Sequence, residues 1–338
     1  MVNQKSMDIR ELKDSKLLWF TISTLIIAGL IYFAGAEKFI KSVYQADISL
    51  LVLALGTGLL VFAFWGYSWY RIFQKSGIDM NLSSSLETFM AGQFMNSITP
   101  LGQFGGEPVM AYLVRANSDA NYEKSISSVF SADLLNATPF ITFTIAGALY
   151  LAVFGSLNQA VTYALYTALA VLLLGGFVAY LLWFKPGTVE KKILAVFERG
   201  ADHTRRLEKY LDTIEEKLQE VQDSFDRIGD DPLYLLKTAG IAHIGFMLQV
   251  VSFYLVMYSL GYTPAIVPVY FIVVLSSLAS FTPTPGGSGA FEGVMAGMVE
   301  LFLPYGFTIG LTAAILFRIC TYWSGIVIGW IAFNNLKK

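Results

Sequence analysis

The stretch TPTPGGSGAFEG, residues 282–293, interrupts an apolar segment with two prolines, four glycines and a glutamate. Proline removes a backbone donor and glycine weakens a helix, so a regular helix is not expected to continue here. In a lipid bilayer, irregular backbone is tolerated only where protein or a water-filled cavity satisfies its amide and carbonyl groups. In a membrane protein, this stretch therefore predicts a broken helix beside a polar cavity.

The composition of the chain is that of an integral membrane protein. Of its 338 residues, 55% are hydrophobic and 14% are charged, against roughly 25% charged residues in an average soluble domain. The net charge of −2 gives no indication of a nucleic-acid partner, and one cysteine with two histidines leaves no basis for a disulfide or a metal site. No nucleotide or zinc motif occurs, so we expect no cofactor and no metal.

Six apolar runs have the length of a membrane span, which is about 17 to 25 residues. They cover residues 17–35, 48–70, 126–154, 160–184, 236–260 and 307–333. The first is expected to be a retained anchor, because it is longer than the roughly 7 to 15 residues of a signal-peptide core. Two further apolar segments, 86–114 and 265–303, are broken by TPLGQFGGEP and by TPTPGGSGAFEG.

The basic residues predict which side of the membrane each loop faces, because short cytoplasmic loops retain Lys and Arg. They gather in the segments 1–16, 71–124 and 185–237, so both termini are predicted to be cytoplasmic. We expect an all-α polytopic protein of the cell membrane, with six full spans and two re-entrant hairpins. Eight spans are the alternative, which is less favoured because residues 289–303 give only about 22 Å of helix for a core of about 30 Å.

This topology divides the chain into four parts. They are a cytoplasmic segment at 1–16, a membrane half at 17–184, a cytoplasmic helical segment at 185–235 and a second membrane half at 236–334. The two broken segments take corresponding places in the two halves and start from opposite sides of the membrane. This pattern predicts an inverted repeat, and paired breaks of this kind are typical of transporter binding sites.

The residues around the two breaks also correspond. Glu107 and Glu292 each follow a double glycine, and 26 residues after each glutamate comes a charge inside the next span, Asp133 and Arg318 respectively. The glycines allow two interpretations, which are an anion-binding nest at the start of a half-helix or a simple turn. These glycines are Gly105, Gly106, Gly286 and Gly287. Further along the chain, Gly293 and Gly297 are expected to allow close helix packing.

Charged side chains inside the membrane are the strongest candidates for a site, because each costs about 2.5 to 3.5 kcal/mol at a helix centre on insertion scales. Arg318 has a planar fork that suits phosphate or carboxylate. It is expected either to contact a lipid headgroup or to form a structural ion pair with Glu292 or Glu107. Asp133 either has a function or reaches the interface, and Arg115 either marks the cytoplasmic side or contacts lipid phosphate.

The cytoplasmic segment contains a heptad pattern. Its apolar residues are spaced alternately by four and three, at Leu207, Leu211, Ile214, Leu218, Val221, Phe225 and Ile228. Such a pattern is typical of a coiled coil, here a homodimer contact through 207–228. The alternative is a helical hairpin that folds back on residues 189–205.

Three stretches together resemble the lysylphosphatidylglycerol synthase transmembrane-region family, also called flippase-like domain proteins. TPLGQFGGEPVMAYLVR (99–115) is similar to its Gly-Glu element, PTPGGSGAFEG to its second Pro-Gly-Gly-x-Gly-x-x-Glu element, and LFRICTYWSGIVIG to its closing Arg-containing helix. The resemblance extends from about Leu17 to Phe333 and implies that Glu107, Glu292 and Arg318 are functional positions. Gln103 departs from the family's commoner basic residue.

In that family the domain occurs alone or fused to a lysyl-transfer domain, where it is thought to move the aminoacylated lipid between leaflets. The resemblance implies a translocase for an anionic phospholipid or a polyprenyl-phosphate lipid. Arg318 and the glycines would hold phosphate, and Glu107 and Glu292 would hold sugar hydroxyls or an amine. We expect no enzyme activity, because segment 185–235 is too small for a transferase. The alternative is a membrane scaffold for an envelope glycosyltransferase or lipid-modifying enzyme, docking through 186–232.

Overall fold

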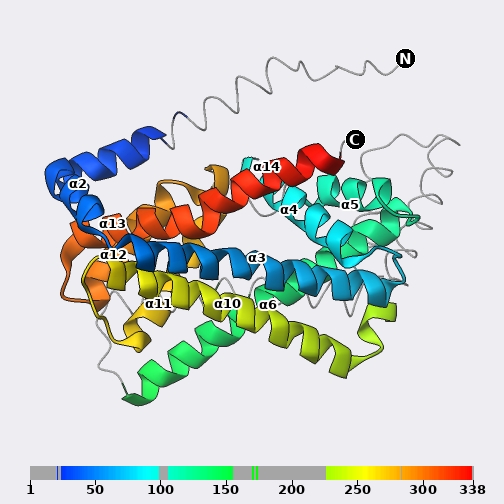
Figure 1. The fold of residues 1–338 in the computed structure, drawn as a ribbon. Helices are drawn as coiled ribbons and strands as arrows, with labels where there is room; N and C mark the ends of the chain where they lie inside the picture. The colour runs from blue at the N-terminus through cyan, green and yellow to red at the C-terminus, as the bar shows by residue number, and fades with distance from the viewer. Residues whose placement is uncertain are drawn as a thin grey trace, which may run out of the picture. The chain divides into compact units, whose positions relative to one another are not determined.

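The computed structural model describes residues 21, 24–98, 106–154, 170, 173, 226–282 and 284–336. Every regular element in these ranges is a helix, which confirms the expected all-α architecture (Figure 1). Four of the described helical runs are long and apolar enough to cross a membrane. They are α3 (Ile48–Ser76), α6 (Tyr122–Phe154), α10 (Pro232–Ser259) and the continuous run Gly306–Leu336.

These four helices match four of the six expected spans. Of the first expected span, the structure describes a short apolar helix at Thr24–Ala34. The run 160–184 lies outside the described residues except for 170 and 173, and so does almost all of the heptad pattern at 207–228. The homodimer contact and the inverted repeat therefore stay predictions.

The chain forms two compact units. The first comprises Met1–Ala63, Glu87–Val109 and Ile244–Lys338, and the second comprises Phe64–Leu86 and Met110–His243. The second broken segment lies wholly in the first unit, together with Glu107, Glu292 and Arg318. Asp133 and Arg115 lie in the second unit.

The second broken segment is a chain of short helices, as its prolines and glycines predict. It consists of α11 (Ile266–Ser276), the 3₁₀ turns η1 (Ser277–Phe281) and η2 (Pro285–Gly287), and α12 (Ala290–Phe302). At 1.5 Å per residue, the 13 residues of α12 are about 20 Å long, which is shorter than the roughly 30 Å hydrocarbon core. This length favours the hairpin over a full span.

A tight helix pair holds the second limb of this hairpin in place. Helix α12 packs along α13 (Gly306–Arg318), which follows it in the chain and lies beside it in Figure 1. A Cβ atom at Gly310 would lie 2.7 Å from the carbonyl oxygen of Ala296 and 2.9 Å from Val299. The two backbones therefore approach as closely as glycine permits, which is a common way for membrane helices to associate.

A π-helical turn interrupts the last long helix directly after Arg318. The turn η3 (Ile319–Trp323) joins α13 to α14 (Ser324–Leu336), and the Ser324 amide donates to the carbonyl oxygen of Ile319, five residues earlier. The carbonyl of Cys320 in this turn lies so close to α3 that no side chain fits at Gly58. Single π turns within α-helices frequently occur at functional sites.

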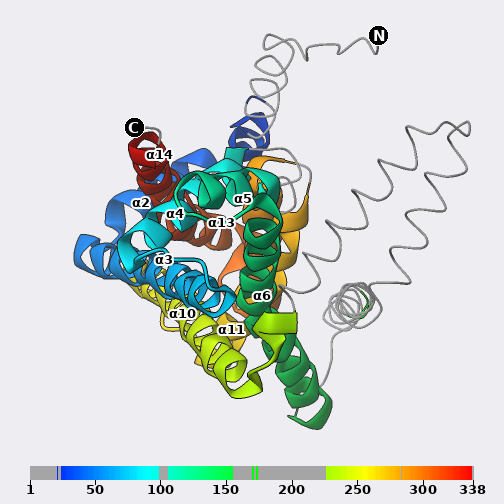
Figure 2. The same cartoon turned by 90° about the vertical axis from the view of Figure 1, so that its right-hand side faces the viewer.

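The second unit is held together by polar contacts between helices. The Nε of Arg71 on α3 donates to the Thr238 hydroxyl of α10 over 2.9 Å, and the Tyr234 hydroxyl of α10 donates to the Arg71 carbonyl oxygen. His243 contacts the hydroxyl of Thr142 on α6 over 2.7 Å. Helix α6, which is labelled in Figure 2, contains Pro139 within its length.

The first broken segment is described at its two ends. Helix α4 (Leu82–Ile98) enters it and α5 (Glu107–Ala116) leaves it, while residues 99–105, including Gly105, lie outside the described residues. A Cβ atom at Gly106 would overlap the side-chain oxygen of Asn96 on α4. A side chain at position 106 would therefore displace the Asn96 amide group.

Candidate functional site

Arg318 and Glu292 form a buried ion pair at the end of α13. The Nε of Arg318 lies 3.2 Å from Oε1 of Glu292, and the two residues are 5% and 1% exposed. The other carboxylate oxygen, Oε2, accepts the amide of Gly289 at the start of α12 over 2.6 Å. The carboxylate therefore joins the arginine to the positive end of a half-helix.

Arg318 also binds the glycine turn directly. One terminal nitrogen, Nη2, donates to the carbonyl oxygen of Gly286 over 2.8 Å and to the hydroxyl of Ser288 over 3.1 Å. The other terminal nitrogen, Nη1, has no hydrogen-bond partner among the residues that the structure describes. Arg318 thus keeps donors for one further acceptor, although its position is already fixed by three hydrogen bonds.

Two aromatic rings enclose the guanidinium group. Its central carbon lies 3.5 Å from the ring centroid of Tyr322 in the π turn and 4.9 Å from that of Phe291 on α12. The Tyr322 hydroxyl donates to the carbonyl oxygen of Ser97, in the last turn of α4, over 3.2 Å. Cation–π contacts of this kind are worth about 2 kcal/mol where water is excluded. The end of the first broken segment therefore contributes, through Tyr322, to the site of the second.

The glycine turn uses its amide groups within the protein. Gly286, Gly287 and Gly289 have φ angles of 56°, 70° and 88°, a left-handed backbone that favours glycine. The amides of Gly287 and Ser288 donate to Thr284 and Pro285, and that of Gly289 donates to Glu292. The Glu292 carboxylate is therefore the anion at the start of this half-helix. Towards Arg318, the turn presents the carbonyl oxygen of Gly286, which accepts a hydrogen bond. Phosphate contact by these glycines stays a prediction.

Glu107 has the same place in the first broken segment, as the first residue of α5. It is 3% exposed, and its Oε2 has no hydrogen-bond partner among the described residues. A buried carboxylate is costly unless it is paired, protonated or bound to a ligand. Glu107 is therefore a candidate for binding a cation, a hydroxyl or a proton.

The remaining predicted site residues lie apart from this group in the sequence and belong to the second unit. Arg115 is exposed in the last turn of α5, where a cation complements the helix dipole. Asp133 is half-buried on α6. A role in ligand binding stays a prediction for both.

Glycine packing was expected at Gly293 and Gly297. Leu30 of the Thr24–Ala34 helix lies 3.6 Å from a Cβ built at Gly293, an ordinary van der Waals distance, so close packing that needs glycine stays a prediction there. No described atom lies within 4 Å of one built at Gly297. Gly289 has a tighter contact, because its Cβ would lie 2.6 Å from Ile26. The first apolar helix therefore packs on the glycine face at the start of α12.

A cavity of about 280 Å³ is lined in part by Ser288, a hydrogen-bond partner of Arg318. One wall is the first apolar helix, with Thr24, Ile27, Ala28 and Ile31, and the other walls are Pro285, Ser288 and Trp323. The lining is thus largely apolar, and one of its two polar side chains, Ser288, is bonded to the arginine.

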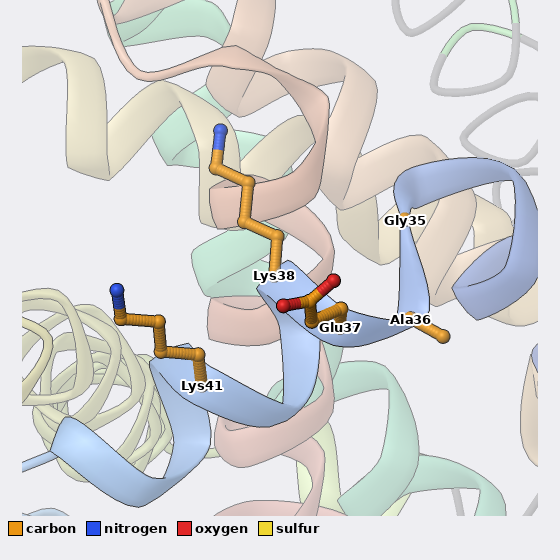
Figure 3. Close-up of a pocket in the computed structure, with 5 residues that line it drawn as sticks. All are labelled: Gly35, Ala36, Glu37, Lys38 and Lys41. Atoms are coloured by element: carbon orange, nitrogen blue, oxygen red, sulfur yellow. The ribbon is translucent and has the colours of Figure 1, made fainter.

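A second hollow, of about 440 Å³, lies along the start of α2 (Ala36–Gln45) and is shown in Figure 3. It is lined by five residues of one segment, Gly35, Ala36, Glu37, Lys38 and Lys41. The side chains of Lys38 and Lys41 extend to the same side of the helix (Figure 3). Because one exposed segment supplies the whole lining, this hollow is a surface feature and a weaker candidate.

Three features of this site, Tyr322, Ser288 and the π turn, were not predicted from the sequence. Tyr322 lies four residues after Arg318, so its position one helical turn away was a signal that could have identified it as a neighbour. The π turn has no comparable signal in residue type. The arrangement of Ser288 depends on the left-handed glycines on either side of it.

Comparison with known proteins gives the family. Residues 20–329 match the lysylphosphatidylglycerol synthase TM region. The chain is 24% identical to a UPF0104 membrane protein of Pyrococcus horikoshii, over 96% of this chain and 98% of the relative. A UPF0104 membrane protein of Methanocaldococcus jannaschii is also 24% identical, over 98% and 97%, and one of Methanothermobacter thermautotrophicus is 21% identical, over 92% and 93%. The chain therefore belongs to the lysylphosphatidylglycerol synthase TM-region family of helical membrane proteins.

Proposed function

We propose that this protein is a translocase for lipids with a phosphate headgroup, in which Arg318 contacts the phosphate within the membrane. The observation that carries the proposal is Nη1 of Arg318, which has no partner among the described residues, on a buried arginine whose other donors are engaged. A charged residue at membrane depth normally faces a partner or a cavity. Here the arginine has a partner in Glu292 and a cavity beside Ser288.

The ion pair explains how a cation is kept in the site without a ligand. Glu292 compensates the charge of Arg318 and keeps the arginine oriented between transport events. A phosphate oxygen at Nη1 adds a charge-assisted hydrogen bond, which is worth about 1.5 to 3 kcal/mol. This gain does not require the Glu292 pair to break.

Glu107 supports the same function from the first broken segment. Its Oε2, which has no partner among the described residues, can accept a hydrogen bond from a headgroup hydroxyl or amine. A phosphate-binding arginine provides no such acceptor. The carboxylate also offers a group that can take up a proton, so that transport is either facilitated or coupled to protons. The chemistry of this site is binding, and we propose no catalytic role for it. The proposed location is the cell membrane.

The test is flipping of fluorescent phospholipids in liposomes that contain the purified protein. Arg318→Lys keeps a positive charge for Glu292 but loses the second terminal nitrogen. We expect lipid flipping at least about tenfold slower, since one charge-assisted hydrogen bond of about 1.5 kcal/mol corresponds to that factor. Arg71→Lys is the matched control, because Arg71 bonds Thr238 and stacks on Tyr234 outside this site.

The panel should include phosphatidylglycerol, phosphatidic acid and a polyprenyl phosphate. Wild-type rates equal to those of protein-free liposomes for all three lipids would refute the translocase. Equal rates for wild type and Arg318→Lys would refute the role of the arginine fork.

A further inference from the structure

The cavity beside Arg318 is unsuited to water. Its volume of about 280 Å³ corresponds to roughly nine water molecules at about 30 Å³ each. Thr24 and Ser288 supply its polar side chains, and Ser288 already interacts with Arg318. A buried water needs two to four polar partners, so most of this volume favours hydrocarbon.

The position of the cavity selects the kind of hydrocarbon. One wall is the apolar helix Thr24–Ala34. Trp323 on another wall is 38% exposed, so the cavity reaches the surface of the first unit. Ser288 in the lining accepts a hydrogen bond from Arg318, a buried cation whose Nη1 has no partner among the described residues. An occupant that matches both the apolar lining and this cation is an amphiphile with an anionic head next to its chain.

We propose that this cavity binds the part of a lipid chain nearest to its phosphate, with the phosphate on Arg318 Nη1 and the chain between the first apolar helix and Trp323. This inference rests on the proposed function and adds a chain-binding site to it. The first helix thereby becomes part of the binding site as well as an anchor. Its contacts at Gly289 and Gly293 fix one side of the cavity.

Photo-crosslinking tests the proposal. Benzoylphenylalanine is introduced in place of Ile31, which lines the cavity, or of Phe33, which is 87% exposed on the same helix. Each protein is reconstituted with equal amounts of phosphatidic acid and of diacylglycerol carrying the same acyl chains, and mass spectrometry counts the lipid adducts. At position 31 we expect several-fold more adducts with phosphatidic acid, and Arg318→Lys should remove this excess. At position 33 both lipids should react equally.

An equal ratio of the two lipids at positions 31 and 33 overturns the cavity proposal, because it indicates ordinary bilayer contact. A second variant measures transport: Ala28→Trp fills the cavity and should slow flipping several-fold, whereas Leu25→Trp, at a position 66% exposed on the same helix, should not. If flipping is absent and crosslinking still depends on phosphate, the cavity is a lipid site and the translocase fails. If flipping occurs and crosslinking ignores phosphate, the cavity proposal fails alone.

Discussion

Neutralising Glu292 tests whether the ion pair holds the second hairpin together. Glu292→Gln keeps the size of the side chain and its hydrogen bond to the Gly289 amide, but leaves Arg318, at 5% exposure, without its counter-charge. Removing one partner of a buried pair costs about 3 to 5 kcal/mol. Two bonds from Nη2 remain, to Gly286 and Ser288. We therefore expect the free energy of unfolding to fall by about 3 kcal/mol, the lower end of that range.

A double-mutant cycle isolates the pair from the rest of the site. Arg318→Gln should cost a similar amount, and the double variant should cost less than the two single variants together, by about 2 to 3 kcal/mol. Unfolding can be followed in a dodecyl sulfate titration by maleimide labelling of Cys320, which is the chain's single cysteine and is 4% exposed. A coupling energy below about 0.5 kcal/mol would refute the argument, because independent sites are additive within that margin.

Three further predictions concern packing and hydrogen bonding. Gly287→Ala should destabilise the protein by at least about 2 kcal/mol in the same titration, because it combines a left-handed backbone with a Cβ 2.8 Å from the Ala279 carbonyl oxygen. Gly297→Ala is the control and should not destabilise the protein, because no described atom lies within 4 Å of its Cβ. Equal effects of the two variants would contradict this prediction. Gly58→Ala should prevent folding, seen as aggregation in size-exclusion chromatography, because its Cβ would overlap the Cys320 carbonyl, and a monodisperse variant would refute the close approach. Thr142→Val should cost about 1 kcal/mol by losing a bond to His243; Thr57→Val, whose hydroxyl bonds only its own helix, is the control and should cost less.

The broken hairpin could be predicted from sequence because its cause is local. Pro283, Pro285 and the glycines after them exclude a regular helix whatever surrounds them. The ion pair was one of two expectations for Arg318, because a buried arginine needs a counter-charge and few carboxylates lie in the apolar segments. Spacing alone did not show that Glu292, rather than Glu107, would be the partner.

Other features depend on contacts that sequence does not encode locally. The π turn after Arg318 orients Tyr322 towards the guanidinium group, and nothing in ICTYW distinguishes it from ordinary helix. The glycine nest was a reasonable expectation from residue type, but the Glu292 carboxylate competes for the same amides from three residues away and accepts that of Gly289. Gly293 and Gly297 look alike in sequence. Among the described residues, however, a Cβ built at Gly293 meets Leu30 of another helix, whereas one built at Gly297 meets no atom within 4 Å.

The energetics of the pair constrain how a lipid can use it. If a phosphate displaced Glu292 from Arg318, the carboxylate would stay buried without a counter-charge and with the Gly289 amide as its remaining partner, at a cost of about 3 to 5 kcal/mol. A charge-assisted hydrogen bond of about 1.5 to 3 kcal/mol does not offset that cost. Binding at Nη1 beside the intact pair is therefore favoured for a headgroup that carries phosphate alone. Displacement becomes competitive only for a headgroup that also brings a cation to Glu292, so the same ion pair gives a physical basis for distinguishing zwitterionic from purely anionic lipids.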